Sequence, residues 1–530
     1  MRRFFLLTLI VSGSVALACG SSDNGNPGTG GGNDAGTNSD TGTPVGSNDA
    51  GNPNNGDTGT PVGNNDAGNP TVDAGAPVSV FPTGKHAALP ILLDQGGPVL
   101  TAPKVVTITF PNDKNQAKFE AFGATATSSD WWKTTTASYC ETGSTTNCVG
   151  PGTGTASHQT AAALTTYNDS QDPAGKSDIR DFITKGITAK TLPAPDATGQ
   201  TIYAMYFPST ATINQTDAQG NIGGSSCQQF AGYHGSGATK DATPIQYTYA
   251  VIPDCVLPDG GTGGSLGEAE TMMFAASHEF VEAATDPYAV YDSTGNLQSL
   301  GYYLNFADNT ITPWNAAGGG ESGDMCVDSL LGTQDQTSYT ADAGTFTVQR
   351  IWNNPNAAAS KDPCVPTTGA TPYFNVAPQQ WITESAVGSS VTFYADAFAD
   401  GTSVSSWTFE GLDFAASDPT NPNEYTTITV NGAKKATVKP GDRVTVTVTL
   451  NKDPGDMTLQ QGGALVGLVS FTGTAPNITA AHFWPMLATS TVDAQDAGLD
   501  TVDAANTSDL QKKAFLHIAH QLPGRLKQML

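Results

Sequence analysis

Basic residues are scarce in this chain of 530 residues, where 23 lysines and arginines stand against 49 aspartates and glutamates. The formal net charge of −26 argues against a nucleic-acid partner, because phosphates need a basic face opposite them. An acidic surface suits a soluble exported protein, and carboxylates suit hard cations. Hydrophobic residues make up 38% of the chain, which is enough for real cores, and the length predicts two folded domains.

Several motifs are also missing. No Cys-x-x-Cys pair occurs, which argues against a zinc site made of thiolates. The glycines at 260–264 are not followed by the Lys of a phosphate-binding loop. The apolar run Phe4–Val11 is too short to span a bilayer.

The N-terminus has the pattern of an export signal, with Arg2-Arg3, an apolar run and then small residues. Val15–Cys19 resembles the lipobox of bacterial lipoproteins, which implies cleavage before Cys19 and lipidation of its thiol. An ordinary signal peptide cut nearby is the alternative. We expect an exported lipoprotein of the outer membrane or cell surface that contacts the membrane through a lipid anchor at Cys19.

Removing Cys19 leaves six cysteines, an even number in an oxidising compartment. No spare thiol then remains to act as a nucleophile. Spacing along the chain favours three disulfides, although sequence alone does not prove their connectivity. The expected pairs are Cys140 with Cys148, Cys227 with Cys255, and Cys326 with Cys364.

Composition divides the chain into five parts. Residues 1–19 form the signal peptide, and residues 20–80 are a Gly-, Asn-, Asp-, Thr- and Pro-rich tether that cannot bury enough apolar surface to fold. Residues 81–368 are a first folded domain, and residues 369–488 a second. Residues 489–530 are an acidic linker with a short helix at 508–521.

The first folded domain contains three apolar runs typical of buried strands, at 104–110, 201–207 and 245–252. A helix is expected to open with a capping box, Ser265 to Glu268, and to stop near Asp286-Pro287. Strands followed by a long helix predict an α/β or α+β domain. Alternating Val and Thr at 443–450 and regular strands around it predict an immunoglobulin-like β-sandwich in the second domain.

The central motif is His278-Glu279-x-x-Glu282. Positions i and i+4 share one face of a helix, so His278 and Glu282 can reach one metal ion. In the His-Glu-x-x-His zincins the residue equivalent to Glu279 is the general base. Glu282 replaces the second His, and a carboxylate still binds Zn²⁺ while shifting the preference toward Ca²⁺. We expect Zn²⁺, with Ca²⁺ as the alternative.

A catalytic zinc needs three protein ligands. Glu321, which follows the Gly-rich stretch 318–320, is the first candidate for the third ligand. Asp286 at the end of the helix is the second, with a plain turn role before Pro287 as its alternative. Asp324 is the last, with a structural hydrogen-bonding role favoured.

The motif Ser277–Pro287 resembles a signature of secreted bacterial zincin-like proteins, as do segments 321–326, 351–354 and 226–234. The same stretch is distantly similar to the exordium (phosphate-induced) family of plant cell-wall proteins. The resemblance covers roughly residues 105–364. It implies an α+β, zincin-like fold, a mixed sheet with an active-site helix, and a metal-binding core with His278 and Glu282 as ligands.

His234 lies in the segment 226–234 and is a candidate catalytic hydrogen-bond donor or extra ligand, unless local backbone satisfies it. The expected function is a surface-anchored, metallopeptidase-like hydrolase acting as a monomer on a polypeptide or cell-surface substrate. The alternative is a non-enzymatic surface or wall-interaction protein with a structural metal.

Overall fold

The computed structural model describes residues 79–80, 83–84, 86–170, 172–173, 175–255, 266–291, 297–305, 312–326, 335–367, 372–401, 404–416, 421–454, 463–474 and 477–490. The predicted signal peptide, nearly all of the predicted tether and the predicted C-terminal helix lie outside the described residues. No helix in these ranges is both long enough and apolar enough to cross a membrane.

A five-stranded mixed sheet, in the order β10-β11-β7-β4-β5, forms the centre of the first half of the fold. Four strands run parallel, and β10 pairs antiparallel with β11 at the edge. The three buried strands predicted from apolar runs are confirmed as β4, β7 and β11. The bounds are β4 Lys104–Thr109, β5 Thr153–His158, β7 Thr201–Phe207, β10 Tyr233–Ala238 and β11 Gln246–Pro253.

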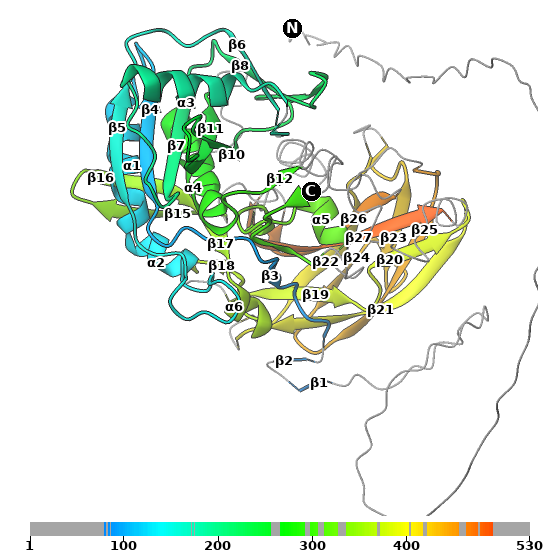
Figure 1. Ribbon diagram of the computed structural model, residues 1–530. Coiled ribbons are helices and arrows are strands. Elements are labelled where there is room, and N and C mark those ends of the chain that lie inside the picture. The colour runs from blue at the N-terminus through cyan, green and yellow to red at the C-terminus, as the bar shows by residue number, and fades with distance from the viewer. Residues whose placement is uncertain are drawn as a thin grey trace, which may run out of the picture. The chain divides into compact units, whose positions relative to one another are not determined.

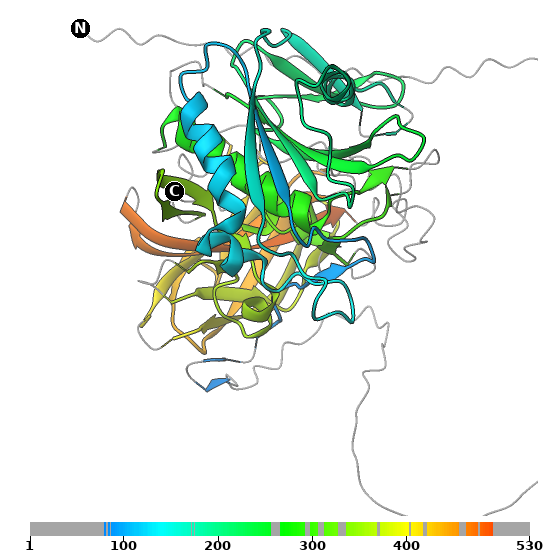
Figure 2. The same cartoon turned by 60° about the vertical axis from the view of Figure 1, so that its left-hand side comes forward.

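Helices cover both faces of this sheet. Side chains alternate along each strand, so each face of the sheet buries its own set of apolar residues against helices. Ile202 and Ala204 of β7 join the hydrophobic cluster that contains α1 and α4, whereas Tyr203 and Met205 join the cluster that contains α3. Figure 2 views α3 nearly end-on, and Figure 1 shows α4 beside the sheet. The bounds are α1 Gln116–Thr125, α2 Asp130–Thr136, α3 Asp178–Ala189 and α4 Glu268–Thr285.

Helix α4 ends where the sequence predicts and begins differently. Its last residue is Thr285, and Asp286 occupies the C-cap ahead of Pro287. At the other end, Gly267 is the N-cap without a side-chain capping bond, so Glu268 is the first helical residue. The predicted capping box is therefore wrong, because it needs Glu268 in the third helical position.

The second half of the fold is a two-sheet β-sandwich, with strand orders β19-β21-β25-β23 and β20-β27-β26-β22-β24. Inward residues of both sheets share one cluster, for example Val446 with Trp484. Strand β25 alternates buried Val with half-buried Thr, as predicted. The bounds are β19 Phe374–Pro378, β20 Ile382–Ser385, β21 Ser390–Ala399, β22 Trp407–Asp413, β23 Thr426–Val430, β24 Lys435–Val438, β25 Arg443–Leu450, β26 Ala464–Thr474 and β27 Asn477–Ser490.

Shorter elements connect these layers. The strands pair as β1-β2, β3-β14, β6-β8-β9, β12-β13, β15-β16 and β17-β18. Their bounds are β1 Ser79–Val80, β2 Thr83–Gly84, β3 Leu92–Asp94, β6 Thr166–Ser170, β8 Thr212–Thr216, β9 Ile222–Ser225, β12 Val290–Tyr291, β13 Leu297–Gln298, β14 Tyr302–Leu304, β15 Gln336–Ala341, β16 Gly344–Gln349, β17 Ile351–Trp352 and β18 Cys364–Val365. The helical pieces are η1 Ala126–Ser128, α5 Thr312–Gly318, η3 Asp324–Cys326 and α6 Asn354–Ala358.

The two halves belong to one compact unit. Residue 368, the predicted domain boundary, separates the two sheet systems in chain order. Packing crosses it, because Ala317 of α5 clusters with Leu487 of β27, and His86 stacks on Phe398 with ring centroids 3.6 Å apart. The predicted first domain therefore shares its core with the sandwich.

All three expected disulfides are present, joining Cys140–Cys148, Cys227–Cys255 and Cys326–Cys364. Three disulfides indicate that the protein folds in an oxidising compartment, which is the environment that an exported protein meets.

Candidate metal centre

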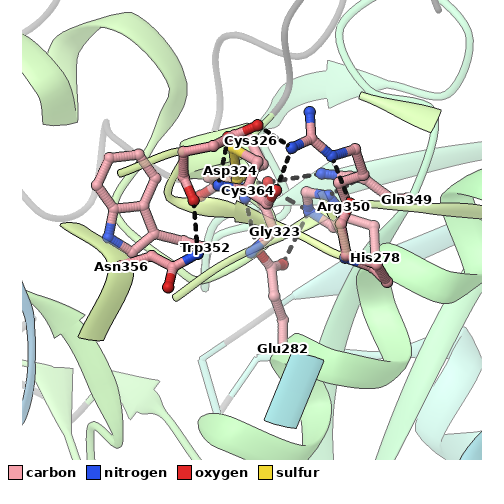
Figure 3. The surroundings of a disulfide bond; sticks show 12 residues. His278, Glu282, Gly323, Asp324, Cys326, Gln349, Arg350, Trp352, Asn356 and Cys364 are labelled. Carbon is pink, nitrogen blue, oxygen red and sulfur yellow. Dashed lines mark hydrogen bonds and ion pairs between the residues drawn. A yellow bond between two sulfur atoms is a disulfide. The ribbon is translucent and has the colours of Figure 1, made fainter. Parts of the chain in front are cut away.

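Helix α4, which carries the central motif, packs between the sheet and strand β16. Met273, Ala276 and Phe280 pack into the hydrophobic core, which fixes the rotation of the helix. The i, i+4 pair His278 and Glu282 then points toward the segment 321–326, as Figure 3 shows.

His278, Glu282 and Asp324 form the first group of metal-ligating side chains, here called the outer cluster. His278 Nε2 lies 3.0 Å from Glu282 Oε2 and 3.6 Å from Asp324 Oδ1. Ligand atoms that sit about 2.1 Å from a tetrahedral zinc lie about 3.4 Å from one another. The two observed separations therefore suit a single ion between them.

Gln349 at the end of β16 orients the ring of His278. Gln349 Nε2 donates to the carbonyl of Gly323 (2.6 Å), so its Oε1 is the atom left facing His278 Nδ1 at 2.8 Å. An amide oxygen only accepts, so Nδ1 carries the proton and donates. Nε2 is then the nitrogen that faces Glu282 and Asp324. Burial opposes charge on the ring, but the neighbouring carboxylates outweigh it and raise the pKa of His278 well above its ordinary value. A metal bound there would replace the proton on Nε2, the arrangement usual for metal-ligating histidines.

Backbone amides hold the other oxygen of Glu282. Glu282 Oε1 accepts from the N–H groups of Gly323 (3.0 Å) and Asp324 (3.1 Å), which leaves Oε2 for the ring. The approach requires glycine, because a Cβ on Gly323 would lie 2.6 Å from His278 Nδ1. The Cys326–Cys364 disulfide anchors the end of this segment (Figure 3).

His234 and the carboxylates of Glu279, Asp286 and Glu321 form a second group, here called the inner cluster. His234 comes from the edge strand β10 and is 5% exposed. Its Nδ1 lies 3.7 Å from Glu279 Oε2, and its Nε2 lies 3.9 Å from Glu321 Oε1 and 3.2 Å from the backbone oxygen of Asp286. Glu282 Oε2, 3.8 Å from His234 Nδ1, links the inner and outer clusters.

Three carboxylate oxygens of the inner cluster are buried and have no hydrogen-bond partner within the described part of the chain: Glu279 Oε2, Asp286 Oδ2 and Glu321 Oε1. Native proteins leave few such atoms unsatisfied, and a bound ion is one of the standard reasons for an exception. The donor set therefore fits a cation.

The titration behaviour of the centre reflects crowded, buried acids. Burial raises the pKa of Asp286 to about 6 and that of Asp324 to about 7. Burial and the neighbouring Glu282 raise the pKa of Glu321 well above its ordinary value, and burial also raises that of Glu279. For Glu282, burial opposes ionisation but the charge of His278 outweighs it, so its pKa is lowered.

Carboxylates outnumber imidazoles five to two in the combined centre. Even with both rings protonated the centre keeps negative charge, and uncompensated buried charge is strongly unfavourable. The group therefore either holds protons or binds cations.

The structure distributes the sequence-predicted residues over both clusters. Asp324, the last candidate for the third ligand, lies beside His278 and Glu282. Glu321 and Asp286, ranked above it, lie around His234 instead. Sequence reasoning missed Gln349, which stands 71 residues from His278 and carries no motif that could have revealed it.

A Gly-x-Ser-x-Gly pattern, the motif of a serine nucleophile elbow, occurs at 263–267. In a nucleophile elbow the strand leads directly into the serine. Here β11 ends at Pro253, twelve residues earlier. Ser265 itself lies outside the described residues, and the pattern carries no assignment.

The chain matches no protein-family model and no curated protein sequence. Among solved structures it is similar to the first domain of VCBP3 from Branchiostoma floridae, with 10% identity over 22% of this chain and 95% of that one and a TM-score of 0.15. A conjugative transposon lipoprotein from Bacteroides eggerthii is 12% identical over 21% of this chain and 95% of its own, with a TM-score of 0.14. Domains 4 and 5 of the S-layer protein SbsC are 13% identical over 38% and 91%, also with a TM-score of 0.14. Scores this low carry no argument about fold or function.

Proposed function

We propose that this protein is a surface-anchored, metal-dependent hydrolase of the metallopeptidase type, with a zincin-like core. The observation that carries the proposal is the outer cluster. One imidazole nitrogen, freed for ligation by Gln349, faces two carboxylates at separations suited to a single ion.

His278, Glu282 and Asp324 would hold the ion, with Zn²⁺ expected and Ca²⁺ as the alternative. Three protein ligands leave a tetrahedral ion one position for exchange, as catalytic sites require. The side chains of His278 and Asp324 are 14% and 25% exposed, so solvent reaches this side of the centre. Bound metal supplies Lewis acidity and makes water more acidic.

Glu279 is the proposed general base. It follows His278 on α4, and its Oε2 has no hydrogen-bond partner among the described residues. Burial raises its pKa, which brings a carboxylate closer to the range in which it can both take and return a proton near neutral pH. Removing the proton acceptor while keeping the shape of the side chain should therefore abolish turnover.

The test is peptide hydrolysis by the purified chain, measured with casein and a peptide library alongside metal analysis. Glu279→Gln should retain metal and lose at least about 100-fold in kcat, the usual size of a general-base contribution. Glu270→Gln, on the same helix beside Lys118, is the matched control and should stay active. Full activity in Glu279→Gln would remove the general-base assignment.

A non-enzymatic surface or wall-interaction protein with a structural metal is the second candidate. The burial of Glu279, which is only 4% exposed, favours this alternative, because a general base must reach the water molecule that attacks the substrate. Metal retention without hydrolysis of any peptide in the library would support this alternative.

The lipid anchor at Cys19 and the cell-surface location belong to the proposal, together with a polypeptide or surface substrate and a monomeric chain. The β-sandwich is proposed as an immunoglobulin-like module that positions the substrate. Its two-sheet architecture supports the likeness, although β20 pairs parallel with β27.

A further inference from the structure

His234, Asp286 and Glu321 bring an imidazole and two carboxylates together in the interior. The ligand atoms offered by His234, Asp286 and Glu321 all lie within 4.8 Å of one another. Asp286 is fully buried and Glu321 is 4% exposed. This group shares no residue with the outer cluster of His278, Glu282 and Asp324.

The hydrogen bonds of Asp286 leave a specific atom free. Its Oδ1 accepts from the N–H of Gly301 at 2.7 Å, which fixes the carboxylate, while its Oδ2 has no partner in the described ranges. Its backbone oxygen lies 3.2 Å from His234 Nε2. Glu321 Oε1, 3.9 Å from the same nitrogen, also lacks a hydrogen-bond partner in those ranges.

An ion in the outer cluster does not account for these atoms. Its ligands would be His278 Nε2, Glu282 Oε2 and Asp324 Oδ1, and none of them belongs to the inner group. Asp286 and Glu321 would remain as two buried carboxylates beside a single imidazole. Either a shared proton or a second cation must compensate their charge in the interior.

We propose that His234, Asp286 and Glu321 hold a second cation, separate from the outer ion on which the proposed function rests. Oxygen ligands predominate here, from two carboxylates and a backbone carbonyl, so a hard cation such as Ca²⁺ or Mn²⁺ is the class favoured. Because these ligands are more deeply buried than those of the outer cluster, this inner ion exchanges more slowly. It joins three separate elements: β10, the end of α4 and the Gly-rich segment before η3.

The rival explanation is a proton shared between Asp286 and Glu321, with no cation. The two explanations differ in their response to Glu321→Gln. An amide imitates a protonated carboxyl group, so a shared proton predicts that Glu321→Gln binds as much metal as the wild type. A bound cation would lose an anionic ligand, so the metal affinity of the inner cluster would fall.

The experiment counts metal in the full chain after equilibration with Zn²⁺ and Ca²⁺ and removal of unbound ions. The wild type should hold two equivalents. Glu321→Gln should hold about one, in the outer cluster, and Asp324→Asn about one, in the inner cluster. Glu384→Gln, at an exposed position on β20, is the matched control and should hold two. A rise of the melting temperature with added Ca²⁺ should occur in the wild type and be absent in Glu321→Gln.

If Glu321→Gln does not fold, a Mn²⁺ titration of the unmodified chain followed by electron paramagnetic resonance supplies the count. Two classes of bound Mn²⁺ support the proposal. One equivalent in the unmodified chain overturns it and indicates the shared proton. The proposed function fails separately, if two equivalents bind and no peptide is hydrolysed.

Discussion

At the scale of single residues, Gln349 decides which nitrogen of His278 is available for a metal. Its side chain accepts from Nδ1 and donates to the carbonyl of Gly323, so the ring and the loop are fixed together. Residues in this supporting position typically change metal affinity 10–100-fold when they are lost.

Gln349→Leu should therefore weaken metal binding by roughly 10–100-fold, because the ring loses its acceptor and its orientation. Competition with a chromophoric chelator measures the affinity. Thr345→Val, at an exposed position on the same strand, should leave it unchanged. An affinity equal to the wild type in Gln349→Leu would show that the outer cluster is ordered by other contacts.

At the scale of elements, the Cys326–Cys364 disulfide determines where the segment 321–326 lies. It joins the end of η3 to β18, and Asp324 stands two residues before the bridged cysteine. The Cys140–Cys148 disulfide closes a much shorter loop, and its cysteines are not members of either cluster. The two bridges therefore form a natural pair of test and control.

The double variant Cys326→Ser/Cys364→Ser should lose roughly 4 kcal/mol of unfolding free energy by loop entropy, against roughly 2.5 kcal/mol for Cys140→Ser/Cys148→Ser. Only the first variant should also lose metal affinity, since it frees the ligand-bearing segment. Denaturant unfolding and metal titration measure the two effects. Equal metal affinities in the two variants would contradict a positioning role for the bridge.

At the scale of the whole molecule, the buried carboxylates should make the free energy of unfolding depend on bound cations. Any ligand that binds only the folded state stabilises it by mass action, by about 2.7 kcal/mol at 100 times its dissociation constant. Excess chelator should therefore lower the melting temperature by several degrees, and restoring metal should reverse the change. Calorimetry with and without chelator at matched ionic strength is the measurement, and identical melting temperatures would exclude metal-dependent stability.

His482 of β27 gives a second global prediction. Burial lowers its folded pKa to about 4, and the ring packs edge-on against Tyr373. The unfolded chain takes up this proton near pH 6.5 and the folded chain only near pH 4, so stability falls as the pH drops between these values. The loss reaches about 3 kcal/mol.

Urea unfolding at pH 7, 5.5 and 4.5 tests this dependence. The carboxylates of the metal centre titrate in the same range, so the readout is the difference between the wild type and His482→Phe. As the pH falls, the wild type should lose stability relative to His482→Phe, and a constant difference would show that His482 does not resist protonation in the folded state.

How far the sequence predicts this fold depends on how local each signal is. The apolar run Thr201–Phe207 is buried on both faces, so composition alone marks it as a strand. Strands such as β10, with its Gly, Ser and His, carry no such pattern and are ordered by their neighbours. The start of α4 was misplaced for a related reason: Lys114 and Asn115, distant in sequence, bind the carboxylate of Glu268 that the capping box would have used.

The sequence by itself determined the helix with its i, i+4 pair, the even set of six cysteines and the acidic balance of the chain, because each follows from spacing or composition. Only the tertiary structure decided that Asp324 rather than Glu321 stands beside His278, and that Glu321 and Asp286 gather around His234. The first arrangement depends on how the glycine-rich segment 318–323 packs against α4. The second depends on β10, an edge strand whose His234 lies more than 40 residues before His278. Contacts across such distances are selected by packing of the whole core, which no local pattern encodes.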